Sequence, residues 1–139
     1  MPATLDHIGI PVSNIDATID FYDRMLGFKL IEKRVDRGLA FATIRISETT
    51  AIAIWEAEMQ PCHHFALALT QSEFDATYEA LRREGIRYGN ATDGFGDDGN
   101  LYGLKLNMKG PDSEMGAKGS CKSLYFEDPD GHSVEILCY

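Results

Sequence analysis

Three side chains in this sequence have the types and settings that suit metal chemistry: two histidines and one glutamate. His7 and His64 each lie in a stretch where large apolar residues alternate with other residues, as in a half-buried strand. Glu135 lies in an otherwise apolar run, where a charge is costly unless it is paired or bound to a cation. Two imidazoles and one carboxylate that converge form a three-ligand site for Fe, Mn, Ni, Co or Zn, with positions left open for substrate or water.

The elements that must position these residues begin with a strand at residues 5–12, in which His7 lies on the face opposite Ile8, Ile10 and Val12. Ser13 or Asn14 can cap a following helix, and Gly27 provides its end. The spacing of four apolar residues predicts the buried stripe of this helix: Ile15, Ile19, Tyr22 and Leu26. Three β-rich runs follow, at 29–36, 39–46 and 51–55.

A second copy of this pattern begins with the strand at residues 64–69. Ser72 to Asp75 resembles the start of a capped helix, which ends at Gly85, and an extended run covers 86–90. Residues 91–120 form a long glycine-rich connection in which only 101–108 has strand character, and 122–127 with 133–138 form a hairpin. A shift of 57 positions relates His7 to His64, and a shift of 58 relates Gly27 to Gly85.

We therefore expect one α+β domain over residues 1–139, built from two βαβββ modules at about 1–60 and 61–139. Their curved mixed sheets should form a cup around a metal-centred cavity that His7, His64 and Glu135 face. Gly9, Ala66 and Ala68 would leave room there for a ligand. Taken one at a time, a strand histidine is more often a structural residue and a buried glutamate is often an ion-pair partner, but the repeat favours the metal site.

The composition excludes several other classes of protein. There are 13 Lys and Arg against 22 Asp and Glu, a formal net charge of −9, which disfavours sequence-independent nucleic-acid binding. The sequence has no apolar run long enough to cross a bilayer and begins without the pattern of a signal peptide, so we expect a cytoplasmic protein with no membrane partner. Its three cysteines form no closely spaced pair, which predicts reduced thiols.

Three motifs occur in this order along the chain: Leu-Asp-His-Ile-Gly-Ile-Pro-Val at the start, His-His-Phe-Ala-Leu in the middle and Asp-Pro-Asp-Gly-His-Ser-Val-Glu-Ile near the end. As a set they resemble the vicinal oxygen chelate superfamily, which includes glyoxalase I, bleomycin-resistance proteins and extradiol dioxygenases. The resemblance covers nearly the whole chain apart from 91–120, and it implies that His7, His64 and Glu135 are metal ligands. It is weak for the reaction, because these signatures serve several chemistries.

Glyoxalase I usually adds a fourth ligand on the last strand of the first module. Matching the turn 47–50 to 128–131 gives an offset of 81, which places Ile54, a non-ligand, opposite Glu135. Glu56 lies two residues further along the same face and is a possible fourth ligand. If instead the other set of alternating residues on this strand faces the cavity, Ile54 becomes a core residue and Trp55 a wall of the substrate pocket.

Phe95 and Tyr102 are further candidates for the substrate pocket, on a loop that could close over a bound ligand. The resemblance implies a metal-dependent lyase or isomerase whose small substrate chelates the ion through vicinal oxygens, with Glu135 as ligand and proton shuttle. A non-catalytic small-molecule binder and an extradiol dioxygenase are the alternatives. Fosfomycin thiol transfer is disfavoured by comparison with the usual pattern of those enzymes. They have Thr at the position of Gly9 and a basic residue a few positions after the glutamate, which is lacking after Glu135. A homodimer whose sites take His7 from one subunit and the other two ligands from its partner is one way to close the cup.

Overall fold

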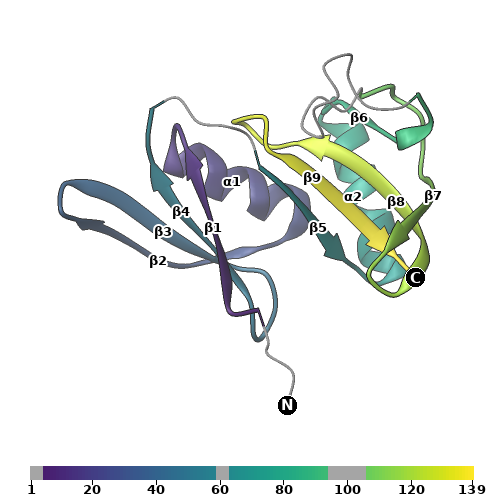
Figure 1. The fold of residues 1–139 in the computed structure, drawn as a ribbon. Coiled ribbons are helices and arrows are strands. Elements are labelled where there is room, and N and C mark those ends of the chain that lie inside the picture. The colour runs from purple at the N-terminus through teal and green to yellow at the C-terminus, as the bar shows by residue number, and fades with distance from the viewer. Residues whose placement is uncertain (1–4, 59–62, 94–105) are drawn as a thin grey trace. The chain divides into compact units, whose positions relative to one another are not determined.

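The computed structural model describes residues 5–58, 63–93 and 106–139. The chain divides into two compact units, residues 1–61 and 62–139, each with one main helix and one sheet (Figure 1). Every helix among the described residues is too short or too polar to cross a membrane.

The first unit pairs its first and last strands in parallel and completes the sheet with antiparallel neighbours. The strand order is β1-β4-β3-β2. The elements are β1 (His7–Val12), α1 (Ile15–Leu26), β2 (Lys29–Asp36), β3 (Leu39–Arg45) and β4 (Ala51–Glu56). Alternation along β4 buries Ile52 and Ile54 completely on the core face, whereas Ala53 and Trp55 on the other face are half-buried.

Helix α1 begins where the sequence predicts, because the Asn14 side chain accepts a hydrogen bond from the Ala17 backbone N–H. It ends at Gly27, whose φ of 70° lies in the left-handed region. The predicted stripe is only partly correct, because Ile19 and Leu26 are half-buried. The helix instead turns a stripe centred on Thr18 towards the core: Ile15, Thr18, Phe21, Tyr22 and Met25.

The second unit repeats this topology with strand order β5-β9-β8-β6, and β7 pairs with β8 outside that path. Its elements are β5 (His64–Ala68), α2 (Gln71–Arg83), β6 (Tyr88–Gly89), the short 3-10 helix η1 (Ala91–Asp93), β7 (Asp112–Gly116), β8 (Gly119–Glu127) and β9 (Ser133–Cys138). Strands β5 and β9 are parallel, as β1 and β4 are in the first unit. The chain therefore has the predicted α+β fold of two related modules.

Two expectations for the second unit need correction. Helix α2 is capped by Thr70 rather than Ser72, because Thr70 and Glu73 exchange side-chain and backbone hydrogen bonds in a complete capping box. The connection 91–120 is not all irregular, since β7 and the first residues of β8 form a hairpin whose Gly119 has a φ of 108°. Of the expected strand 101–108, residues 106–108 are not in a strand, and the rest lie outside the described residues.

Candidate metal centre

His64 is held at the start of β5 by the neighbouring strand. In the parallel register it lies beside Ser133 on β9, and its Nδ1 is 3.1 Å from the Ser133 carbonyl oxygen. A carbonyl oxygen only accepts, so Nδ1 carries the proton and donates it. The neutral ring then has its lone pair on Nε2, the tautomer that is seen when a backbone carbonyl orients a metal-binding histidine.

Glu135 lies on the same face of this sheet, because it pairs with Ala66, two residues beyond His64 on β5. Its residue exposure is only 6%, and its Oε2 is 3.5 Å from His64 Nε2. Its other oxygen, Oε1, is buried and has no hydrogen-bond partner among the described residues. A buried carboxylate with an unsatisfied oxygen is costly, so this side needs a proton donor or a cation.

The pKa of His64 reflects this neighbour. The Glu135 carboxylate raises the pKa of His64 above its usual value, burial of the ring works in the opposite direction, and the Ser133 carbonyl adds to the increase. In the metal-free protein the pair can therefore share a proton as an imidazolium and a carboxylate. His64 and Glu135 could also hold a divalent metal ion, which would supply the positive charge between them in place of that proton.

Tyr125 and Cys121 add two neutral groups to the same sheet. Tyr125 pairs with Glu135 across β8 and β9, and its ring stacks on His64 with centroids 6.2 Å apart. Burial and then the charge of Glu135 raise the pKa of Tyr125, and the same two causes, in the same order, raise the pKa of the Cys121 thiol. Both groups stay protonated, so the negative charge of this face is held by carboxylates.

The residues in the second unit fit part of a metal site. Two ligands of one ion, each about 2.1 Å from it, are separated by a distance close to the 3.5 Å between His64 Nε2 and Glu135 Oε2. The oriented imidazole and the unsatisfied carboxylate oxygen are the donor types that a divalent transition metal takes. Within neither unit do three or more His, Cys, Asp or Glu side chains gather into such a site, as far as the structure describes them. A metal ion held by His64 and Glu135 would therefore require at least one further ligand.

The turn before β9 holds His64 and Glu135 in place, a role that we did not assign from the sequence. His132 is buried, and its Nδ1 accepts a hydrogen bond from the His63 backbone N–H at 2.9 Å. The Asp128 carboxylate accepts from the His132 backbone N–H, and Ser133 N–H donates to the His63 carbonyl. The Asp-Pro-Asp-Gly-His stretch thus ties β5 to β9 directly beside His64. His63 packs its ring on His132, with centroids 5.5 Å apart.

In the first unit His7 occupies the position on β1 that His64 occupies on β5. Its Nδ1 is 2.7 Å from Asp6 Oδ2, and because a carboxylate accepts, Nδ1 again carries the proton. Both histidines therefore have Nδ1 tied to an oxygen acceptor and, when neutral, the lone pair on Nε2. The His7–Asp6 pair is largely exposed, unlike the pair of His64 and Glu135.

The position equivalent to Glu135 in the first unit is Ala53, which corrects the offset of 81 to 82. Gly9 pairs with Ala53 on β1 and β4, as Ala66 pairs with Glu135 on β5 and β9. Ile54 lies on the opposite face and is completely buried in the core. The placement of Ile54 opposite Glu135 was therefore wrong. The turn 47–50 leads directly into β4, whereas one further residue separates the turn 128–131 from β9.

The side chain of Glu56 does not share the face that carries His7. It lies on the face of β4 that includes Ile54, and its Oε1 accepts a hydrogen bond from the Ile15 backbone N–H at 3.0 Å. Glu56 thus satisfies a free N–H in the first turn of α1 and places a negative charge at the positive end of that helix. The structure gives it a capping role instead of the possible role of fourth ligand.

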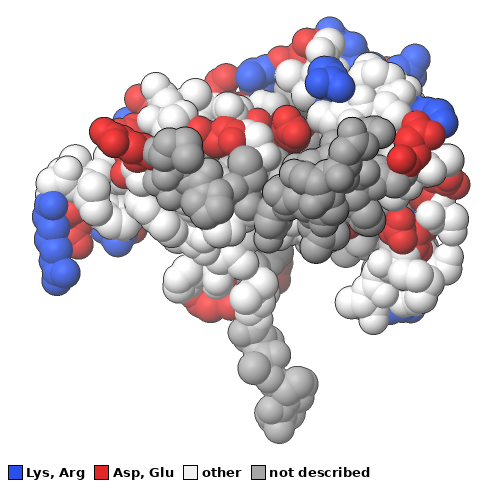
Figure 2. Space-filling model, turned by 45° about the horizontal axis from the view of Figure 1, so that its top comes forward, with Lys and Arg blue, Asp and Glu red and all other residues white. Residues whose placement is uncertain are grey.

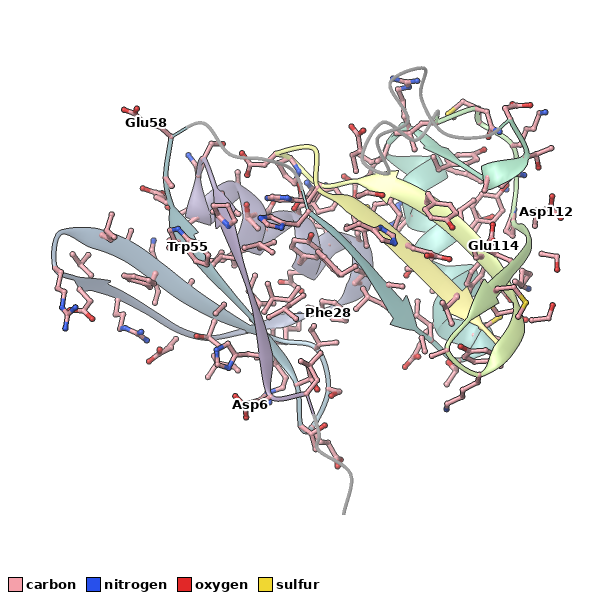
Figure 3. The ribbon with its side chains drawn as sticks, in the orientation of Figure 1. Asp6, Phe28, Trp55, Glu58, Asp112 and Glu114 are labelled. Atoms are coloured by element: carbon pink, nitrogen blue, oxygen red, sulfur yellow. The ribbon has the colours of Figure 1, made fainter. Side chains whose placement is uncertain are left out.

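Trp55 lies on the face of β4 that carries Ala53, in agreement with the alternative assignment of the faces of this strand (Figure 3). A Cβ atom at Gly9 would be only 3.0 Å from Trp55 Cζ3, so the glycine lets the indole lie across β1 on the His7 face. Trp55 can therefore form a wall over that face. Phe95 and Tyr102, the other expected pocket residues, lie outside the described residues.

Among the curated proteins that match, two do so over almost the entire chain. The Virulence protein STM3117 of Salmonella typhimurium strain LT2 is 25% identical over 139 residues, which cover 97% of this chain and 83% of that protein. The Metallothiol transferase FosB of Lysinibacillus sphaericus strain C3-41 is 23% identical over 137 residues, with 96% and 80% covered.

A solved structure of a fosfomycin resistance protein shares the fold. FosX of Listeria monocytogenes, as a mutant form in complex with Mn(II) and 1S,2S-dihydroxypropylphosphonic acid, superposes with a TM-score of 0.66 at 20% identity, covering 99% of this chain and 93% of that one. The family model described as the Glyoxalase/Bleomycin resistance protein/Dioxygenase superfamily matches residues 4–136. The chain belongs to this superfamily.

Proposed function

We propose that this protein is a metal-dependent, glyoxalase-like enzyme of the lyase or isomerase type. His7, His64 and Glu135 would hold one divalent transition metal, namely Zn, Ni, Mn, Fe or Co, and a small oxygenated substrate would bind the ion through vicinal oxygens. The observation that carries the proposal is the contact of His64 with the buried Glu135, in which His64 Nε2 is oriented and Glu135 Oε1 has no hydrogen-bond partner among the described residues. Mn(II) in the FosX structure supports a metal in this family.

Two neutral imidazoles and one carboxylate leave a bound divalent ion with a net positive charge, so it would supply Lewis-acid stabilisation of negative charge on the substrate oxygens. The protein residues fix the ligands in place. The Ser133 carbonyl sets the tautomer of His64, and the Asp6 carboxylate does the same for His7. The absence of a fourth ligand at Ala53 favours a three-ligand site with more positions for substrate.

Glu135 is also the residue that we propose for proton transfer. Its carboxylate would take a proton from a substrate carbon or oxygen and return it. Tyr125 stays protonated next to this carboxylate, so its hydroxyl can donate a hydrogen bond to an anionic oxygen. Burial of Glu135 and Tyr125 strengthens both interactions by limiting contact with water.

Metal affinity of ligand variants tests the proposal. Glu135→Gln and His64→Ala should each weaken Mn(II) or Ni(II) binding at least tenfold while the fold, followed by circular dichroism, is retained. His63→Ala is the matched control, because it removes an imidazole from the preceding position, where the ring packs on His132 instead of facing Glu135. Unchanged affinity in both ligand variants would contradict the proposed site. A wild-type protein that binds a small molecule but no metal would favour the non-catalytic binder.

We further propose that the protein is a homodimer in which His7 of one subunit completes the site formed by His64 and Glu135 of its partner. His7 belongs to the unit 1–61, and the other two ligands belong to the unit 62–139. Neither unit alone brings three ligands together among its described residues, so two units must combine. Pairing between subunits is one way to combine them.

A further inference from the structure

A pocket of about 340 Å³ lies against the His7 face of the first sheet. That volume is within the range of small-molecule sites. Its floor is formed by small side chains on β3 and β4, and longer side chains from β2 and β3 surround it. The residues used below are His7, Glu32, Arg34, Thr43, Arg45 and Ala53. All of them lie in the first unit.

The charges that line this pocket are not all paired. Glu32 forms an ion pair with Arg34, and Asp6 with His7. Arg45, at the end of β3, contacts only the carbonyl oxygens of Ser47 and Glu48, at 3.3 and 3.5 Å, which is long for a hydrogen bond. Arg45 has no carboxylate partner among the described residues. Its guanidinium is therefore the positive charge of this pocket that has no counter-charge.

The positive charge of Arg45 contrasts with the overall charge of the chain. The chain has nine more acidic than basic side chains, and Figure 2 shows Asp and Glu in several separate patches on the visible face. A negatively charged field disfavours the approach of anions in general. Recognition of an anion therefore requires local donors, and the fork of N–H groups on a guanidinium matches the oxygens of a carboxylate or phosphonate.

We propose that Arg45 binds an oxyanion group, a carboxylate or a phosphonate, of a small ligand in this pocket. Thr43 is two residues earlier on β3 and lies on the same face, so its hydroxyl can add a hydrogen bond. His7 lines the same pocket, and the part of the inference that concerns substrate rests on the proposed function. A substrate with an oxyanion at Arg45 and vicinal oxygens towards the metal ligand His7 would be fixed at two points, and neutral analogues would bind poorly.

The probes are lactate and methylphosphonate, with propane-1,2-diol as the neutral analogue, at constant ionic strength. Binding is followed by ¹H–¹⁵N NMR, first in the metal-free protein so that the anion site is measured by itself. We expect both anions to shift signals of β3 and β4, with Arg45→Gln weakening the tighter of them at least about tenfold. Arg45→Lys should retain part of the affinity, because it keeps the charge and loses the fork. The stronger of the two anions identifies which group the pocket takes.

Arg24→Gln is the control, because it removes the same charge from an exposed position on α1, where Arg24 pairs with Asp20. An equal loss in this control would overturn the inference, since the effect would then be one of net charge. Equal binding of the diol and the anions would overturn it as well. If metal binds as expected but neither anion does, the inference fails and the proposed function stands. If the anions bind through Arg45 and no metal binds, the inference stands and the proposed function fails.

Discussion

Ala53 occupies in the first sheet the place that Glu135 occupies in the second. Each lies two residues along from the partner of a histidine in a parallel pair of strands, His7 with Ala51 and His64 with Ser133. With a carboxylate at one of the two places and a methyl group at the other, the two sheets differ in charge there, although the backbone repeats.

Substitutions at Ala53 and Ile54 should distinguish the two faces of β4 by their effects on stability. Ala53→Glu puts a carboxylate on the half-buried His7 face, so we expect a loss of less than about 1 kcal/mol in unfolding free energy and tighter metal binding. Ile54→Glu puts the same group into the fully buried core and should cost more than about 3 kcal/mol. Urea denaturation measures both. Similar costs for the two variants would show that the face assignment is incorrect.

Removal of the Glu56 carboxylate should affect stability and leave the metal alone. Glu56→Ala deletes the acceptor for the Ile15 N–H and a negative charge at the start of α1, so we expect a loss of about 1 kcal/mol. Metal affinity should remain at the wild-type value. Glu79→Ala, on the exposed side of α2, is a control for the loss of a surface carboxylate. A large drop in metal affinity for Glu56→Ala would restore Glu56 as a ligand.

The interaction of His64 with Glu135 should be visible in the pH dependence of the metal-free protein. Because the carboxylate raises the pKa of His64, its titration by NMR should lie above that of an ordinary histidine, and Glu135→Gln should lower it. The ion pair stabilises the fold at pH below the pKa of an unfolded histidine, and this contribution is lost as pH rises through the folded pKa. Metal affinity should show the opposite trend, since protonation of His64 at low pH would compete with a bound ion. An identical titration in Glu135→Gln would contradict this coupling.

The sequence predicted the repeat well, because strand alternation, the Asn14 cap and the Gly27 stop are local signals. It also predicted which face of β5 and β9 carries His64 and Glu135, as the register now places them. It failed for β4, where Ala51 to Trp55 is apolar throughout and alternation does not reveal which residues face the core. The roles of Glu56 and His132 could not be read at all, since each depends on a contact with a residue distant in the sequence.

Complementation tests the shared site. A His7→Ala chain and a Glu135→Gln chain are each expected to bind metal weakly. After subunit exchange, a shared arrangement gives the mixed dimer one intact site and one with both defects, so binding should return at up to one site per mixed dimer. Native mass spectrometry verifies the exchange. Exchange without recovered binding would mean that each site is built within one chain.

The stoichiometry and ligand set of the bound metal test the central claim most directly. We expect protein loaded with Mn(II), Ni(II) or Zn(II) and freed of excess ion to hold close to one ion per chain, with X-ray absorption indicating two imidazole nitrogens and a carboxylate. In a separate measurement with free ion present, the melting temperature should rise by several degrees. A free-ion concentration of a hundred times Kd contributes about 2.7 kcal/mol to the free energy of unfolding. No uptake of any of these ions at neutral pH, or an ion bound without imidazole nitrogens, would contradict a centre formed by His7, His64 and Glu135.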